Sequence, residues 1–324
     1  MSTIEEVLSG AATHHVACER AESFIGRLPD GCVSLMTLDF PYYGVKDDAW
    51  DNAWESPEAF IAWMGGVLAQ CRRVLAPNGS IYVFASPEMA WKVEGAVREY
   101  FVMLNAITWH KQEHTAALKY GAENFRGYVE KSERVLFAEP RSRVPEMIKV
   151  ARAAAGMSRQ DISEHVVGSR SGACWNWESG LSFPAADNWT SLRRILPSLP
   201  EYSVVARPFS VSAATPHTDV WTYETVNTYP GKHPCEKPPR MARDIVRASS
   251  REGGLVADFF CGSGAFLAAA VAEGRRAIGC DMDPHWAEQA HRRCDAVKAT
   301  GRIVRTSPKP KDDRQQDLFS GRAA

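Results

Sequence analysis

The first part of the chain alternates short β-type runs with amphipathic segments of helical length. Ser56-Pro57-Glu58 is typical of a helix start, because serine caps the helix and proline and an acid suit its first turn. Runs at 33–38, 80–85 and 103–109 are predicted strands, separated by helices predicted at 57–74 and about 87–99. Strands that alternate with helices indicate a largely parallel sheet covered on both faces.

The character of the sequence changes near Pro140. From there to about residue 200 the chain has short helical patterns rich in Arg, Ser and Trp, and no good strand. Regular order returns with a helix predicted at 239–250, a strand at 254–260, a helix at 265–273 and a strand at 277–280. These patterns predict an α/β fold with a doubly wound, mostly parallel sheet and a small helical insert. We expect four parts, at 1–139, 140–200, 201–303 and a flexible tail at 304–324.

Composition narrows the class of protein. With 324 residues, 45% of them hydrophobic, the chain can bury a substantial core and is not wholly disordered. No apolar run approaches the roughly 20 residues that cross a bilayer, and the acidic N-terminus does not resemble a signal peptide. The eight cysteines are scattered without a C-x-x-C pair, which argues against a zinc site and a disulfide framework. We therefore expect a reduced, cytoplasmic protein without a metal.

The near-neutral net charge of −1 conceals an uneven distribution. Residues 1–60 carry three basic and eleven acidic side chains, whereas residues 141–200 carry eight basic and five acidic ones. The segment 302–324 is also basic, with six basic and three acidic side chains. Since phosphate contacts need local positive charge, a nucleic acid would meet the middle of the chain and the tail first.

A glycine-containing loop follows the predicted strand that ends near Asp258. In the loop Asp258-Phe259-Phe260-Cys261-Gly262-Ser263-Gly264, the glycines allow a tight turn and close approach to a ligand. Asp281 ends the next strand, where an acid can accept hydrogen bonds from both ribose hydroxyls. The third glycine of a dinucleotide loop is missing, which favours a nucleoside without a pyrophosphate, such as S-adenosylmethionine. By itself the pattern fits a purely structural β-turn-α unit equally well.

A second candidate site follows the strand at 33–38. Asp39-Phe40-Pro41-Tyr42 could be an ordinary strand end with a proline turn. It could also act on the exocyclic amine of a base, whose lone pair is delocalised into the ring. The Asp39 carboxylate and a backbone carbonyl next to Pro41 could accept the amine hydrogens, while Tyr42 stacks on the flipped base. A sulfonium methyl donor needs no metal, so the rate would come from positioning and electrostatics.

These two segments resemble motifs of the DNA amino-methyltransferases. The segment at 39–42 resembles their (D/N/S)PP(Y/F) motif, the loop at 258–264 resembles D-P-F-x-G-x-G, and the segment at 233–238 resembles H-P-x-x-K-P. Trp109-His110-Lys111 and the segment at 133–137 also look like family segments. The order, with the catalytic motif first and the cofactor loop last, is that of the β class, and the resemblance covers 18–139 and 230–295.

The resemblance implies roles for particular residues. It implies that S-adenosylmethionine is the cofactor, that DNA is the substrate and that a homodimer is possible. Phe40 and Phe259 depart from the family pattern, because each stands where the family has proline. The implied catalytic residues are Asp39, Pro41 and Tyr42, and the implied cofactor residues are Asp258, Phe260, Gly262, Gly264, Asp281, Lys237 and Pro238.

The resemblance leaves the target base and even catalysis open. An Asp at position 39 favours N6 of adenine over N4 of cytosine, and the cytosine enzyme stays the alternative. A third possibility is a non-catalytic DNA-binding regulator on the same fold, against which the intact Asp39, Tyr42 and loop glycines speak.

The insert contains a pattern similar to the DNA-binding helices of phage-repressor-like proteins. Ser158, with Asp161 three residues later, predicts a helix start, 168–171 a turn, and 173–178 a second helix. In such proteins the second helix enters the major groove, which makes Arg170, Ser171 and Asn176 candidate readers of DNA bases. The alternative is a small helical lid, and we expect Trp175 and Trp177 to be core residues in either case.

The tail contains a short apolar pair in polar surroundings. Gln315-Gln316-Asp317-Leu318-Phe319 resembles the Q-L-(S/D)-L-F peptide with which bacterial replication proteins hold the sliding clamp. Gln315, Leu318 and Phe319 would then make a groove contact. A solvated tail with a chance Leu-Phe pair is the favoured interpretation.

Overall fold

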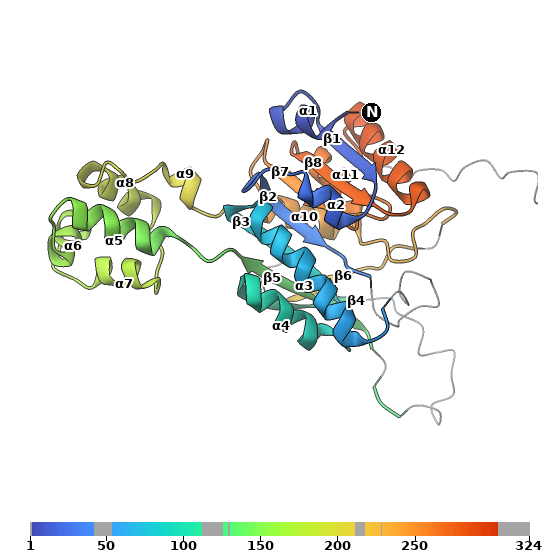
Figure 1. The fold of residues 1–324 in the computed structure, drawn as a ribbon, viewed down its shortest axis with the longest axis horizontal. Helices are drawn as coiled ribbons and strands as arrows, with labels where there is room; N and C mark the ends of the chain where they lie inside the picture. The colour runs from blue at the N-terminus through green and yellow to red at the C-terminus, as the bar shows by residue number, and fades with distance from the viewer. Residues whose placement is uncertain are drawn as a thin grey trace, which may run out of the picture.

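The structure is a computed structural model, and it describes residues 2–41, 54–111, 126–128, 130–210, 218–227 and 229–303. Figure 1 shows an α/β body from which a helical unit projects. Tyr42, Gln315, Leu318 and Phe319 lie outside the described residues, so their predicted roles stay predictions. No helix in these ranges is long and apolar enough to cross a membrane.

The body is built on a sheet in which eight strands are described, in the order β1-β8-β7-β2-β3-β5-β4-β6. Of these strands, only β5 runs antiparallel to its neighbours, which confirms the predicted mostly parallel sheet. The strands are β1 (His14–Cys18), β2 (Val33–Leu38), β3 (Leu75–Ala85), β4 (Val102–Lys111), β5 (Ser132–Glu139), β6 (Val220–Tyr223), β7 (Leu255–Asp258) and β8 (Arg276–Asp281).

Helices cover both faces of the sheet. One face packs against α1 (Ile4–Ser9), α2 (Ala21–Gly26), α3 (Pro57–Val74) and α4 (Ala90–Tyr100), and the other against α10 (Pro239–Ser249), α11 (Ala265–Ala272) and α12 (Pro284–Thr300). The predicted cap of α3 is present, since Ser56 Oγ accepts a hydrogen bond of 3.1 Å from the Ala59 amide. Helix α11 has an apolar sequence because it packs between α10 and α12 as well as on the sheet.

The central strands are buried along most of their length because helices cover both faces of the sheet. Five of the six residues of β2 are buried, and so are all four residues of β7. Strand β3 begins before the predicted strand at 80–85 and includes residues 77–79, and its pairing with β2 shifts register between Val33 and Leu35. This irregularity accommodates the extra residues without ending the strand.

Strand direction gives the sheet two functionally different edges. We call the edge where β2, β7 and β8 end the carboxyl edge, and the edge where they begin the amino edge. The register pairs Thr37 with Asp258, and Asp258 with Gly279. Asp39, Asp258 and Asp281 therefore all lie at the carboxyl edge, as the sequence predicts.

The helical unit, residues 144–205, has its own core. It consists of α5 (Val144–Ala154), α6 (Arg159–Val167), α7 (Ala173–Ser179), α8 (Ala186–Ile195) and α9 (Tyr202–Val205). Helix α6 begins with the predicted capping box, in which Ser158 Oγ accepts from the Asp161 amide and the Asp161 carboxylate accepts from the Ser158 amide, both at 3.1 Å. Gly168, with φ of +77°, ends α6, so two helices separated by a tight turn occupy the predicted places.

The two tryptophans of α7 differ, and the expectation for one of them is wrong. Trp177 is buried in the core of the unit, as expected, together with Trp189 and Leu192. Trp175 is 50% exposed. Residues two positions apart on an α-helix point in directions that differ by about 200°, so a short helix that buries Trp177 must turn Trp175 outward.

The helical unit is attached at the amino edge of the sheet. Because β5 is antiparallel, its last residue, Glu139, pairs with Val102, the first residue of β4. Arg207 Nε contacts Glu139 at 2.6 Å, and Asn78 Nδ2 donates to the carbonyl of Ser203 at 3.1 Å. Both connections are thus fixed at the edge opposite Asp39, and Figure 1 shows the unit on the left, away from the carboxyl edge.

Candidate active site

The glycine-containing loop after β7 is held by two carboxylates. Asp258 is buried, and its Oδ1 accepts a hydrogen bond of 3.1 Å from the Phe260 amide. The Gly262 amide donates to Asp281 Oδ2 at 2.9 Å, and the Asp283 amide donates to Asp281 Oδ1 at 3.0 Å. The structure therefore brings together Asp258, Gly262 and Asp281, which the sequence places in one cofactor site.

Three glycines permit the close packing around this loop. Gly264 has φ of +78°, and a Cβ there would lie 2.7 Å from Ala290 Cβ on α12. At Gly262, with φ of +47°, a Cβ would lie 3.1 Å from the ring of His233. Gly279 was missed by the sequence analysis, although a Cβ there would collide with the carbonyl of Asp258. A glycine inside an otherwise apolar strand was the available signal.

Burial changes the titration of both acids. Desolvation raises the pKa of Asp258 well above its ordinary value, against the hydrogen bond from Phe260. It also raises the pKa of Asp281, against the hydrogen bonds from the Asp283 and Gly262 amides. Asp281 is only partly buried, so its carboxylate can meet a polar ligand at the carboxyl edge.

The two phenylalanines that replace family prolines are packing residues. Phe40 is buried, and its ring lies 4.7 Å from that of Phe260 and 5.8 Å from that of Trp63, measured between centroids. Phe259 is buried against Phe24 at 5.9 Å. The substitutions remove no polar group from the site, and the Phe40–Phe260 contact joins the catalytic segment to the cofactor loop.

Asp39 belongs to a network of alternating charges. Lys237 Nζ donates to Asp39 Oδ2 at 2.6 Å and lies 3.5 Å from Glu133 Oε2. Lys111 Nζ lies 2.6 Å from Glu133 Oε1. Burial by itself would lower the pKa of Lys237, but the carboxylates of Asp39 and Glu133 outweigh it and raise the pKa above its ordinary value. The 4% exposed ammonium therefore stays charged.

The network differs in part from the sequence expectation. The resemblance assigns Lys237 to the cofactor together with Pro238, whereas its ammonium contacts Asp39. The sequence analysis did not single out Glu133 as a site residue. Its signal was topological: an acid at the start of an antiparallel strand lies at the same edge as the ends of the parallel strands. Pro41, two residues after Asp39, is half-buried at the same edge.

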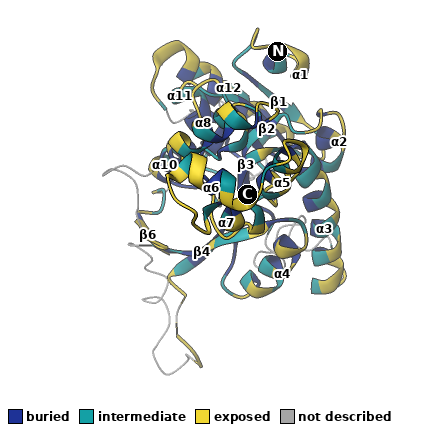
Figure 2. Cartoon of the chain, turned by 90° about the vertical axis from the view of Figure 1, so that its left-hand side faces the viewer, coloured by how far each residue is buried: buried dark blue, intermediate teal, exposed yellow. Residues whose placement is uncertain are grey.

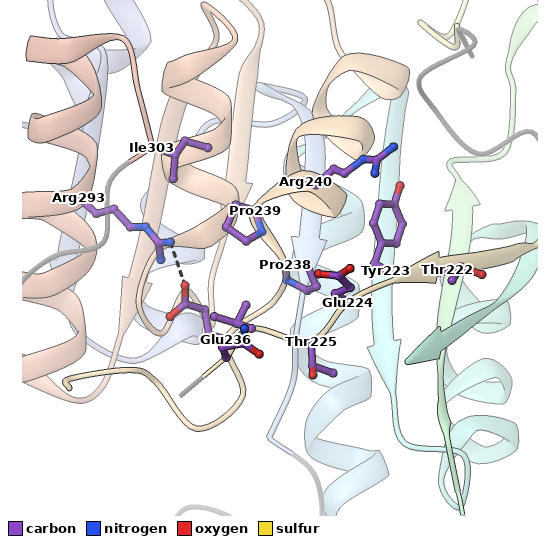
Figure 3. A pocket seen from close by; sticks show the side chains of 12 residues that line it. Thr222, Tyr223, Glu224, Thr225, Glu236, Pro238, Pro239, Arg240, Arg293 and Ile303 are labelled. Atoms are coloured by element: carbon purple, nitrogen blue, oxygen red, sulfur yellow. Dashed lines mark hydrogen bonds and ion pairs between the residues drawn. The ribbon is translucent and has the colours of Figure 1, made fainter. Parts of the chain in front are cut away.

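A second buried ion pair supports the segment that carries Lys237. Arg293 Nη2 on α12 lies 2.9 Å from Glu236 Oε1, and its Nη1 donates to the carbonyl of Ser263 at 3.2 Å. Figure 3 shows this pair at a pocket of about 370 Å³. Pro238 is the one predicted site residue among the lining residues of the pocket.

The predicted DNA-reading residues lie apart from these groups. Arg170 is exposed on the turn before α7, where it contacts Glu164 at 2.9 Å and Asp161 at 3.7 Å. Ser171 Oγ accepts from the Ala173 amide at 3.3 Å, and Asn176 lies in α7. Figure 2 looks onto this unit and shows much of α6 exposed. The structure does not bring these residues to the carboxyl edge.

The arrangement at the carboxyl edge suits transfer of a group from a nucleoside-type cofactor to a substrate that donates a hydrogen bond to Asp39. Gly262 and Gly264, both at positive φ, allow the tight turn of the loop, and the half-buried Asp281 can offer a carboxylate to hydroxyl groups. Asp39, fixed by Lys237, supplies a hydrogen-bond acceptor at the adjacent strand end. Residues and cofactor therefore fit: these groups would hold S-adenosylmethionine beside Asp39.

Comparison with known proteins identifies this arrangement. The DNA methylase family model matches residues 33–292. DNA adenine methyltransferase YhdJ of Escherichia coli K12 is 25% identical over 275 residues, which cover 84% of this chain and 79% of that protein.

Two solved structures share the fold. TTHA0409 of Thermus thermophilus, complexed with S-adenosyl-L-methionine, has a TM-score of 0.52 at 20% identity, covering 92% of this chain and 99% of that one. PvuII DNA methyltransferase, which is cytosine-N4-specific, has a TM-score of 0.55 at 13% identity, covering 86% of each chain. The chain belongs to the DNA methylase family and is an S-adenosylmethionine-dependent DNA amino-methyltransferase.

Proposed function

We propose that the base methylated is adenine, at N6, after it has been flipped out of the duplex. Asp39 is the observation that carries this proposal, because an Asp in the first position of the motif favours adenine over cytosine. The similarity to YhdJ, a DNA adenine methyltransferase, supports it. The second candidate is N4 of cytosine, which the fold shared with the cytosine-specific PvuII enzyme supports.

In this proposal Asp39 activates the amine. The carboxylate of Asp39 and the carbonyl of Phe40, next to Pro41, accept the two amine hydrogens, which concentrates the nitrogen lone pair outside the ring. Bound S-adenosylmethionine supplies an activated methyl group on a sulfonium. With the methyl group supplied in this way to the amine nitrogen, Asp39 would hold the proton that the amine must lose. Tyr42 would stack on the flipped base.

Lys237 is a positioning residue in this scheme. Its contact with Asp39 Oδ2 fixes the direction of the carboxylate, and Glu133 in turn fixes the ammonium. Nearly complete burial of Lys237 leaves little freedom for either group. The acceptor is thereby oriented before substrate binds, so that little reorganisation is needed at the moment of transfer.

The residues on the cofactor side have separate roles in binding. Asp281 would accept hydrogen bonds from the ribose hydroxyls, Gly262 and Gly264 allow the tight turn of the loop, and Asp258 holds that turn. Phe260 offers an apolar surface and contacts Phe40, which keeps the donor site in register with the acceptor site. Pro238 borders the site next to Lys237.

The helical unit is proposed to contact DNA through Arg170, Ser171 and Asn176. Its attachment to the amino edge supports a contact away from the reacting base. Strand β2 has six residues and so spans roughly 20 Å from one edge of the sheet to the other. We propose that the unit anchors a flanking or second stretch of DNA. A homodimer and a clamp contact through Gln315, Leu318 and Phe319 stay predictions.

The target base is tested by tritiated methyl transfer to mixed-sequence duplex DNA, with the product nucleosides separated and identified by mass. N6-methyladenine is expected. N4-methylcytosine would contradict the choice of base and keep the mechanism. Tight DNA binding without methyl transfer would contradict the proposal and favour a non-catalytic DNA-binding regulator.

A further inference from the structure

Two histidines and an aspartate meet at the amino edge, far from the active site. His14 is the first residue of β1, and His291 and Asp295 lie one turn apart on α12, which packs against β1. His14 Nε2 lies 3.3 Å from Asp295 Oδ1, and His291 Nε2 lies 3.4 Å from Asp295 Oδ2. One potential ligand atom from each of the three residues falls within a span of 4.8 Å.

Hydrogen bonding in this cluster is incomplete. His14 is 4% exposed, and within the described residues its Nε2 is a buried nitrogen without a hydrogen-bond partner. His291 Nδ1 is a second such atom. Buried polar atoms are nearly always satisfied, so the unsatisfied His14 Nε2, 3.3 Å from the Asp295 carboxylate, calls for a bound partner that the nitrogen and the carboxylate could share.

One tautomer of His14 would suit a metal. His14 Nδ1 lies 3.1 Å from Thr13 Oγ1, so an Nδ1–H can donate to the hydroxyl and leave the Nε2 lone pair directed at Asp295.

The spacing of the ligand atoms matches a tetrahedral ion. Zinc bonds of about 2.0–2.2 Å to nitrogen and oxygen place neighbouring ligands about 3.3–3.5 Å apart in a tetrahedron. Each imidazole lies at such a separation from one oxygen of the Asp295 carboxylate, His14 Nε2 at 3.3 Å from Oδ1 and His291 Nε2 at 3.4 Å from Oδ2. Two imidazoles and one carboxylate are also a ligand set that zinc accepts.

We propose that His14, His291 and Asp295 bind one Zn²⁺ ion that fastens α12 to β1. Asp295 is on the surface, with a 57% exposed side chain, which gives the ion a path of entry and leaves room for water as a fourth ligand. The site lies at the edge opposite Asp39. The ion is therefore structural, takes no part in methyl transfer, and does not depend on the proposed function.

The test uses the full chain without an affinity tag, stripped of metal by a chelator. Zinc is titrated in competition with a chromophoric chelator, and one ion per chain is expected. Asp295→Asn and His291→Asn should each weaken binding at least tenfold. Glu288→Gln removes another exposed carboxylate from the same helix and should leave the affinity unchanged. Zinc should raise the Tm of the unchanged protein and of Glu288→Gln, but not of Asp295→Asn.

Cobalt separates this site from the cysteines. Co²⁺ bound by nitrogen and oxygen gives visible d–d absorption without the charge-transfer bands of thiolate ligation. Absence of zinc binding, binding that survives both substitutions, or a thiolate band lost with neither substitution would each overturn the proposal. Well below the Tm, Asp295→Asn should transfer methyl groups as fast as the unchanged protein.

Discussion

Replacing Lys237 with methionine removes the cation that contacts both Asp39 and Glu133, and keeps much of the side-chain volume. At an effective dielectric constant of about 20, opposite charges 2.6 Å apart, as in the Lys237–Asp39 pair, attract by about 6 kcal/mol. Desolvation of the ions offsets much of this attraction. Loss of one partner of a buried pair nevertheless destabilises a protein by about 3–5 kcal/mol, because the other charge is left uncompensated.

Two measurements follow from this argument. Urea denaturation of Lys237→Met should show a loss of about 3 kcal/mol, the lower end of that range, because Asp39 and Glu133 retain some exposure. Methyl-transfer kinetics, recorded where the variant is folded, should show kcat lowered about 100-fold with little change in the affinity for S-adenosylmethionine. A 100-fold loss corresponds to about 2.7 kcal/mol of lost positioning.

The controls separate positioning from stability. Lys92→Met breaks the Lys92–Glu58 pair, where Glu58 is 74% exposed, and should cost less than about 1 kcal/mol and no activity. Lys237→Arg keeps the charge and should recover part of kcat. The reasoning is refuted if Lys237→Met keeps kcat within threefold of the unchanged enzyme, or if its affinity for S-adenosylmethionine falls as far as kcat.

Three other predictions test the site and the helical unit. Trp177→Ala should cost about 3–5 kcal/mol in urea denaturation, whereas Trp175→Ala, at a 50% exposed position, should cost less than about 1 kcal/mol; equal losses would contradict the orientation of α7. Burial raises the pKa of Asp281 above its ordinary value, and ribose binding needs the carboxylate, so the affinity for S-adenosylmethionine should fall as pH decreases through that raised pKa. Asp281→Asn should bind the cofactor weakly and without this pH dependence. The same pH profile for Asp281→Asn and the unchanged protein would contradict the assignment. Arg170→Ala with Asn176→Ala should weaken binding to long duplexes but leave kcat on a short duplex within twofold; equal losses on both would show that the unit reads the methylated stretch itself.

Local sequence signals predicted much of the body. Strand β2 and helix α3 lie where the apolar run and the Ser56-Pro57-Glu58 start predict them, because both depend on burial and capping within one segment. The meeting of Asp39, Asp258 and Asp281 was also predictable. In a parallel sheet the ends of neighbouring strands share one edge, so three acids at three strand ends must be close.

Features that depend on strand direction and long-range pairing were not predictable in this way. The apolar pattern of β5 does not reveal that it runs antiparallel, yet this direction brings Glu133 to Lys237 and sends the helical unit to the opposite edge. The expectation for Trp175 was wrong because it was based on the apolar character of tryptophan, whereas the position of Trp175 on α7 determines its exposure. In the cluster of His14, His291 and Asp295, the i,i+4 spacing of His291 and Asp295 is local, but their meeting with His14, at the other end of the chain, depends on tertiary packing.

Methyl transfer by Asp39→Ala, compared with the unchanged protein at saturating S-adenosylmethionine and duplex DNA, tests the central claim most directly. Incorporation of tritium into DNA and cofactor binding by calorimetry are measured on the same preparations. The account predicts loss of transfer to background with cofactor affinity within a few-fold of the unchanged protein, because Asp39 acts on the amine and Asp281 on the cofactor. Measurable turnover by the variant would contradict the role of Asp39.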